Sequence, residues 1–262
     1  TIRSLGNYSR RPKSHPNQHS QEEIKLIKDM FKRNADTGLV VFWVKLKQRG
    51  YTRSISSLYN QMKKLNLKFN VKKKKRKHKS KPYIQMTFPG ERIQIDVKTV
   101  PSKCIVGQFE LYQYTAIDEF SRYRYLKIYG EKSTYTSYKF LLEVLDKFPF
   151  KIYTVRTDNG TEFTKRLISK DPNDITMFEL ALKRKNIHHD LIKPYTPKHN
   201  GKVERSHRKD NERFYSTRRF YSIEDANKQL QLYLREYNNF PMQPLNWKSP
   251  IEMLRDYFDK SK

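Results

Sequence analysis

Apolar residues recur along this chain in two patterns, at helical spacing in the first third and in alternation after residue 90. Ile24, Ile27 and Phe31 follow one another at steps of three and four, which is the spacing of one helix face. Ser20 stands directly before this run and Glu23 three residues later, as in a capping box. The stretch GLVVFWVKLKQRG then ends at Gly50. These patterns predict one helix that starts after Ser20 and a second that ends near Gly50.

A third helix is predicted up to roughly Leu65, with Thr52 as its N-cap. Its apolar stripe consists of Ile55, Leu58, Met62 and Leu65. Its opposite face is polar and basic, and carries Arg53, Ser56, Ser57, Asn60, Lys63 and Lys64. We therefore expect an all-α helix-turn-helix domain over residues 21–68 whose last helix contacts DNA, although any short amphipathic helix has a polar face.

Strand patterns dominate from Glu91 onward. ERIQIDVKTV alternates apolar and polar residues, and FELYQYTAIDEFSRY and YRYLKIY follow as two further runs with a turn at Ser121 and Arg122. A helix over residues 133–148 then leads to the strand KIYTVRT, the helix TMFELALKRKN and the strand HHDLIKP. The chain from Asn200 is mostly helical, although prolines interrupt it. Hairpin strands followed by alternating helices and strands predict an α/β domain with a mixed sheet.

The net positive charge indicates a binding partner. Of 55 Lys and Arg residues, 23 lie in residues 1–90 against 4 Asp and Glu, so 19 of the 28 net positive charges lie there. Such a surface binds polyanions, and double-stranded DNA is the expected partner. No apolar run is long enough to cross a membrane, and the single Cys104 excludes a disulfide or a Cys-based zinc site within this chain. A cytoplasmic, nucleoid-associated location in a bacterium is expected.

Two basic segments flank the predicted helical domain. Residues 1–20 are expected to form an arm whose Arg10 and Arg11 enter a minor groove, or else a solvated linker. Residues 69–88 are expected to form a linker between domains. Its basic run also fits a path along phosphates, and consists of Lys72, Lys73, Lys74, Lys75, Arg76 and Lys77.

Three acids occupy positions that suit one catalytic site. Asp96 lies in the middle of a predicted strand, Asp158 closes another strand, and Glu204 lies near the start of a long helix. Carboxylates from separate elements make an oxygen-rich site that suits Mg²⁺. Taken singly, each acid also fits a structural role as a surface strand residue, a turn residue or a first-turn helix acid.

The motifs IQIDVK, AIDEFSRY, RTDNGTEF and PYTPKHNGKVERSHR together resemble the integrase core of DDE transposases and retroviral-type integrases. The resemblance covers residues 91–254 and includes WKSPIEML near its end. It implies an RNase H-like fold and a catalytic, metal-binding triad of Asp96, Asp158 and Glu204. It also implies two Mg²⁺ ions, with Mn²⁺ as a substitute. The supporting turns are Asn159–Gly160 and Asn200–Gly201. The helical domain and the arm resemble those of bacterial insertion-sequence transposases.

Two features depart from the family pattern. Asp158 and Glu204 are 46 positions apart, because extra residues lie around KRLISKDPND. Many relatives place Lys or Arg seven residues after the glutamate, where this chain has Asn211. Arg208 is our hypothesis for its replacement, and Lys202 and Arg205 are expected to hold the DNA backbone beside it.

Other candidates compete for the site. Asp118 lies on a strand beside that of Asp96, and Glu162 is expected to support the turn after Asp158. His188–His189 would suit a His-rich nickase, and His199–Asn200 a His-Asn-His nuclease, but neither has the surrounding pattern of those enzymes.

The sequence thus predicts a DNA transposase that cleaves and joins DNA by transesterification. Its catalytic core is expected over residues 89–220, with a C-terminal helical extension over residues 221–262. Terminal inverted repeats and target DNA are the expected substrates, and a dimer or higher homo-oligomer is the expected assembly. The alternatives are a DNA-binding protein that has lost catalysis and an RNase H-like, structure-selective nuclease.

Overall fold

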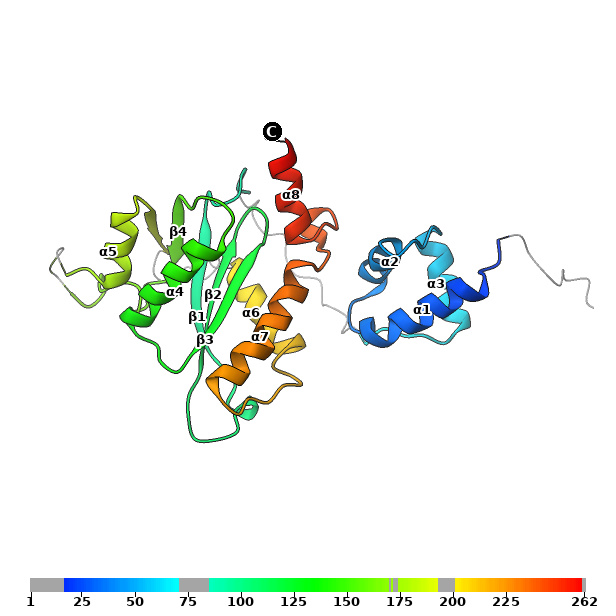
Figure 1. Cartoon of the computed structure of the whole chain (residues 1–262), viewed down its shortest axis with the longest axis horizontal. Coiled ribbons are helices and arrows are strands. Elements are labelled where there is room, and N and C mark those ends of the chain that lie inside the picture. Colours follow the sequence, from blue (N-terminus) through cyan, green and yellow to red (C-terminus); the bar gives the residue numbers. More distant parts are fainter. Residues whose placement is uncertain (1–16, 71–84, 170, 172–173, 193–200, 261–262) are drawn as a thin grey trace, which may run out of the picture. The chain divides into compact units, whose positions relative to one another are not determined.

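The computed structural model describes residues 17–70, 85–169, 171, 174–192 and 201–260. The chain divides into two compact units, Thr1–Lys79 and Ser80–Lys262. The first consists of helices and the second of a sheet with helices (Figure 1). In the described parts of the chain, no helix combines the length and the apolar character that a membrane crossing requires.

The first unit contains the helices α1 (Gln21–Asn34), α2 (Leu39–Lys47) and α3 (Ile55–Lys64). The predicted capping box is present at α1: the Glu23 amide donates to Ser20 Oγ over 3.1 Å, and the Ser20 amide donates to Glu23 Oε2 over 2.8 Å. The helices enclose a small core, and Ile27, Phe42, Leu46 and Leu58 are fully buried in it.

The predicted N-cap of α3 was wrong. Ser54, and not Thr52, has the extended backbone of an N-cap, and its hydroxyl accepts a hydrogen bond from the Ser57 amide. An N-cap residue directly precedes the first helical residue. Because α3 begins at Ile55, Thr52 lies two residues too early to cap it.

The second unit is built on a five-stranded sheet, ordered β3-β2-β1-β4-β5. Its strands are β1 (Ile93–Thr99), β2 (Tyr112–Asp118), β3 (Arg124–Tyr129), β4 (Thr154–Thr157) and β5 (His188–Leu191). The pairs β1–β2 and β2–β3 are antiparallel, whereas β1–β4 and β4–β5 are parallel. The mixed α/β sheet predicted from the sequence is thereby confirmed.

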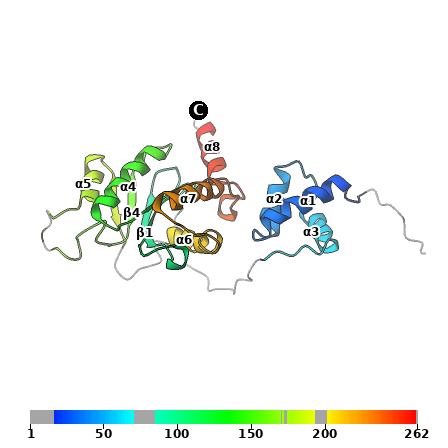
Figure 2. The same cartoon turned by 60° about the horizontal axis from the view of Figure 1, so that its bottom comes forward.

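The two faces of β1 meet different helices, because side chains alternate along a strand. Ile93 and Ile95 are fully buried on the face that Tyr114 of β2 shares. The Tyr114 ring lies 5.4 Å from that of Phe140 in α4 (Thr134–Lys147). The opposite face carries Asp96 and is covered by α6 (Gly201–Arg213), so that α4 and α6 lie on opposite sides of β1 (Figure 2).

Three more helices complete this unit, α5 (Met177–Arg184), α7 (Ile223–Asn238) and α8 (Pro250–Lys260). Ala226, Leu230 and Leu234 of α7 belong to the same hydrophobic core as the sheet. The predicted extension over residues 221–262 therefore begins with a helix that packs into the core. The exact domain boundaries stay predictions.

Candidate active site

Asp96 lies in the middle of β1 and faces α6, with its side chain 16% exposed. Burial is the largest cause of its altered pKa, which rises to about 7. Repulsion by Asp158 adds to the rise, and smaller contributions come from Glu162 and Glu204. Three further carboxylates therefore raise the pKa of Asp96, and two of them are its predicted partners.

Asp158 follows directly after β4, the parallel neighbour of β1. Gln94 pairs with Arg156, so Asp96 and Asp158, each two residues further along, stand level on the two strands. The side chain of Asp158 is exposed, and its Oδ1 accepts a hydrogen bond from the Gly160 amide over 3.0 Å. Asn159 donates its side-chain amide to the carbonyl of Ile192 over 2.6 Å. These bonds hold the turn after β4 and leave the carboxylate at the sheet's edge.

Glu204 lies in the first turn of α6, exposed to solvent. The helix start is tied to β1, because the Val203 amide donates to Gln94 Oε1 over 3.1 Å. Gln94 is two residues before Asp96 and shares its strand face. Gly201 begins the helix, whereas Asn200 lies outside the described residues.

In the described residues, the three acids do not form a compact metal-binding site. In the described ranges, no three His, Cys, Asp or Glu side chains are gathered closely enough to hold an ion. Residues 193–200, directly before α6, lie outside those ranges. The donor set itself consists of carboxylate oxygens, which fit a hard divalent cation.

Glu162 is buried beside this site, with 4% of its surface exposed. Its Oε1 lies 2.9 Å from Lys132 Nζ. A Cβ at position 160 would lie 2.6 Å from Glu162 Oε2, so the glycine there leaves the room that this carboxylate occupies. Glu162 thus packs against the Asp158 turn, in line with the supporting role expected for it.

A buried polar cluster around Glu119, which the sequence did not single out, joins the site's strands to α6. Glu119 accepts hydrogen bonds from Arg92 Nε and from Gln94 Nε2, each over 2.7 Å. Lys202 Nζ lies 3.4 Å from its Oε2 and donates to its backbone carbonyl over 2.6 Å. The cluster fixes Gln94 and Lys202, and these fix the start of the helix that carries Glu204.

A second buried cluster holds α6 further along. Asp210 accepts hydrogen bonds from Arg124 Nη2 over 2.7 Å, from Gln113 Nε2 over 2.8 Å and from the Tyr233 hydroxyl over 2.9 Å. Asp210 and Arg124 are both fully buried. The only sign of this cluster in the sequence was Asp210 itself, an acid on the buried side of α6 seven positions after Val203.

His207 was also missed by sequence reasoning. Its Nδ1 lies 3.4 Å from Asp96 Oδ2, one helical turn after Glu204. Burial, followed by repulsion from Lys98, lowers the pKa of His207 to about 3. The imidazole is therefore neutral at physiological pH, and its contact with Asp96 is not an ion pair.

Asp118, the competing acid, has a structural role. Its carboxylate accepts hydrogen bonds from the amide and hydroxyl of Ser121 and from the Gly90 amide. In the sheet, Asp118 pairs with Ile93, the first residue of β1. These bonds close the β2–β3 turn, where Arg122 adopts a positive φ of 64°.

The predicted DNA contacts on α6 divide into two groups. Arg205 and Arg208 are exposed, and Arg208 Nε lies 3.8 Å from Glu212. Lys202 is bound to Glu119 and is partly buried. Asn211 accepts a hydrogen bond from Lys98 Nζ over 3.1 Å, which places a cation from β1 beside α6.

In the first unit, Ser56, Asn60, Lys63 and Lys64 are exposed on α3, whereas Ser57 is half-buried. Arg53 is engaged within the unit: its Nε donates to Glu23 Oε1 over 2.7 Å, and its other nitrogens donate to the carbonyls of Asn17 and Gln18. It would have to leave these bonds to reach DNA. The remaining predicted contacts lie outside the described residues, namely Arg10, Arg11, Lys72, Lys73, Lys74, Lys75, Arg76 and Lys77.

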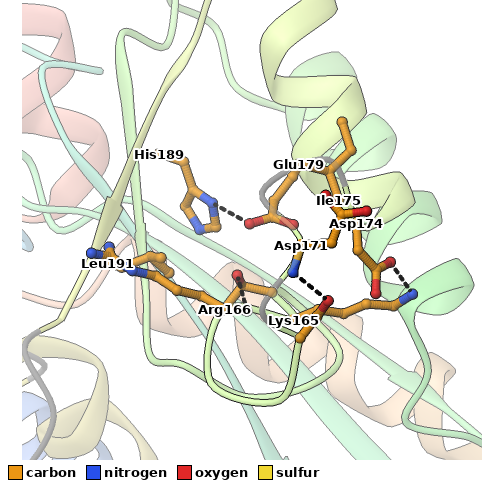
Figure 3. A pocket seen from close by; sticks show the side chains of 10 residues that line it. Lys165, Arg166, Asp171, Asp174, Ile175, Glu179, His189 and Leu191 are labelled. Carbon is orange, nitrogen blue, oxygen red and sulfur yellow. Dashed lines mark hydrogen bonds and ion pairs between the residues drawn. The ribbon is translucent and has the colours of Figure 1, made fainter.

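The extra residues between Asp158 and Glu204 help to line a cavity of about 480 Å³ (Figure 3). Lys165 and Asp174 form an ion pair of 2.5 Å at its wall. His189 projects into it from β5 and lies 3.9 Å from Glu179. Burial lowers the pKa of His189 to about 4, so the ring is neutral, and its Nε2 lies 2.8 Å from Thr157 Oγ1.

Two family models match parts of the second unit. Residues 87–197 match the family model described as integrase core domain, and residues 185–250 match a second model with the same description. Together the matches run over more than half of the chain. The second unit therefore contains an integrase core domain, a domain of DDE polynucleotidyl transferases.

Several curated proteins are similar over parts of the chain. ORF3 of Spiroplasma virus SpV1-C74, which carries the name of an integrase, is 28% identical over 198 residues. The match covers 72% of this chain and 53% of that protein. The retrovirus-related Pol polyprotein from transposon RE1 of Arabidopsis thaliana is 33% identical over 135 residues, which are 49% of this chain and 8% of the polyprotein. The chain thus spans about half of the first relative and a small part of the second.

Among solved structures, one intasome chain superposes with a TM-score above 0.5 and two integrase cores give lower scores. A chain of the simian T-cell lymphotropic virus intasome, solved in complex with a PP2A regulatory subunit, is 14% identical and superposes with a TM-score of 0.51, over 88% of this chain and 74% of that one. The catalytic core of BIV integrase is 18% identical and gives 0.48, over 66% and 99%. The HTLV-2 integrase core in complex with magnesium is 17% identical and gives 0.46, over 63% and 96%.

Proposed function

We propose that this protein is a DNA transposase, which cuts DNA at the ends of an element and joins the freed ends to a target. What supports the proposal is the placement of the acids: Asp158 follows the strand parallel to that of Asp96, and Glu204 lies at the start of the helix that packs on the Asp96 face of β1. Integrase core enzymes perform DNA cleavage and strand transfer, and the specific substrates are part of the proposal.

Asp96, Asp158 and Glu204 would hold the divalent ions, with Mg²⁺ as the natural metal and Mn²⁺ as a substitute. Their oxygens suit such a cation, and mutual repulsion favours its binding. When bound, a pair of such ions activates an attacking oxygen and stabilises a leaving one. The HTLV-2 integrase core is described in complex with magnesium.

Other residues of the protein position the catalytic acids and the DNA. The Glu119 cluster and Gln94 orient the start of α6 against β1, and Asn159 and Gly160 hold Asp158 at the strand end. Arg205 and Arg208, exposed on the same helix as Glu204, would bind phosphates of the DNA. Such positioning contributes much of the rate of a phosphodiester displacement.

The three-helix unit would recognise the terminal inverted repeats, and the basic arm and linker would add affinity along the backbone. Because two element ends are joined to one target, the active form would be a dimer or a larger homo-oligomer. The simian virus neighbour is likewise described as an intasome.

Incubation with labelled element-end DNA, Mg²⁺ and a target plasmid tests this proposal. Wild type should yield nicked ends and joined products, whereas Asp158→Asn should bind the DNA and yield neither. Equal products from both proteins would contradict the catalytic role of Asp158. Binding without products from either would favour a catalytically inactive DNA-binding protein. Cleavage governed by DNA structure rather than by end sequence would favour a structure-selective nuclease.

A further inference from the structure

One face of α3 points to solvent and is built from residues at helical spacing. Ser56, Tyr59, Asn60 and Lys63 follow one another at steps of three, one and three, and all four are exposed. The opposite face contributes Leu58 and Met62 to the core. The helix therefore presents a continuous face that the fold of this unit does not use.

Tyr59 stands at the centre of this face and is 56% exposed. Among the described residues of the first unit, no other large hydrophobic side chain is exposed to this degree. The aromatic rings of this unit otherwise pack together, as Phe31, Phe42 and Phe69 do in edge contacts of 5.1 to 5.7 Å. An aromatic ring left outside such a core is available to a partner.

The charge around Tyr59 indicates the class of that partner. Helix α3 contains no acid and ends with Lys63 and Lys64. All four acids of the described part of this unit precede α2, and two of them are paired, Glu23 with Arg53 and Asp29 with Lys32. A positive, acid-free helix face complements a polyanion.

We propose that Tyr59 is a specificity-determining contact to double-stranded DNA. With α3 in the major groove, the ring would pack against a thymine methyl group and the hydroxyl would hydrogen-bond to a base edge or a phosphate. Ser56 and Asn60 lie beside it and would contact neighbouring bases. This inference rests on the proposed function, in which α1–α3 bind the element ends.

The test starts from a library of duplexes with a randomised core, from which the full-length wild type selects its preferred sequence. Binding of wild type, Tyr59→Ala and Tyr59→Phe is then measured on the selected duplex and on a random duplex. Tyr135→Ala is the matched control, because Tyr135 is 54% exposed on α4 of the other unit. Circular dichroism confirms that each variant is folded.

Tyr59→Ala should bind the selected duplex about tenfold to a hundredfold more weakly and the random duplex as wild type does. Tyr135→Ala should match wild type on both. Equal binding of Tyr59→Ala and wild type to the selected duplex would overturn the inference. An equal loss of affinity of Tyr59→Ala for both duplexes would overturn it too. Either result would leave the proposed function intact. If wild type selects no sequence, end recognition by the first unit fails, and the inference fails with it.

Discussion

The ion pair between Asp210 and Arg124 gives the sharpest prediction about stability. Both side chains are fully buried, and the bond from Arg124 Nη2 to Asp210 Oδ1 is 2.7 Å long. Nε and Nη1 of Arg124 have no hydrogen-bond partner among the described residues. The charge of Arg124 therefore depends on Asp210, with help from the Tyr237 ring 3.5 Å from its guanidinium carbon.

Asp210→Asn keeps the shape of the side chain and removes its charge, so that a buried guanidinium loses its counter-ion. Removal of one partner from a buried pair costs about 3–5 kcal/mol. A charge-assisted hydrogen bond contributes about 1.5–3 kcal/mol of this, and weaker bonds from Gln113 and Tyr233 contribute the rest. We therefore expect the free energy of unfolding to fall by about 4 kcal/mol.

Urea unfolding followed by circular dichroism measures this loss. The matched control is Asp256→Asn, because Asp256 pairs with Lys248 in a bridge whose side chains are 41% and 48% exposed. Such a pair contributes about 0–1 kcal/mol. The apolar double variant Arg124→Met with Asp210→Leu should lose less than Asp210→Asn alone. A loss below about 1 kcal/mol for Asp210→Asn would refute the reasoning.

Three further predictions concern the site, the pH and the basic linker. Gly160→Ala should slow DNA cleavage about tenfold or more, because the new Cβ would lie 2.6 Å from Glu162 Oε2. An unchanged cleavage rate would contradict this packing. Burial would raise the pKa of Asp210, but Arg124 and Lys98 outweigh it and hold the pKa below its usual value. The stability that this carboxylate contributes is thus complete above its unfolded pKa of ~3.9 and is lost as the pH falls through the lower folded pKa. Between pH 5 and pH 3, urea unfolding should therefore show a larger loss of stability for wild type than for Asp210→Asn. Parallel losses in the two proteins would exclude this linkage. Neutralising Lys72–Lys77 should make the slope of log K for DNA binding against log salt shallower, by about 0.9 for each phosphate contact that is lost. An unchanged slope would indicate that the run is only a spacer.

Local patterns in the sequence predicted the elements well. The alternation of Ile93 and Ile95 with polar residues marked β1, and Ser20 with Glu23 marked the start of α1. Both signals arise between residues that are close in the sequence. The N-cap of α3 was placed two residues early, because Thr52 and Ser54 are both good caps and only the helix start decides between them.

The supports of the site could not be predicted in this way. Asp210 meets Arg124 across 86 positions, and Lys202 meets Glu119 across 83. Nothing local to either residue shows which strand will face α6. In AIDEF the sequence drew attention to Asp118, whose role is structural, and passed over its neighbour Glu119. Asp96, Asp158 and Glu204 could be proposed because they resemble a family pattern, and their role as one metal site stays a prediction.

The central claim is that these three acids together hold the divalent ions of a DNA-joining enzyme. Calorimetric titration of Mn²⁺ into the full chain tests it most directly, with Asp96→Asn, Asp158→Asn and Glu204→Gln compared with wild type and with Asp256→Asn. The account predicts that each of the three substitutions weakens Mn²⁺ binding strongly, while Asp256→Asn binds as wild type does. Unchanged Mn²⁺ binding in the three variants would contradict it.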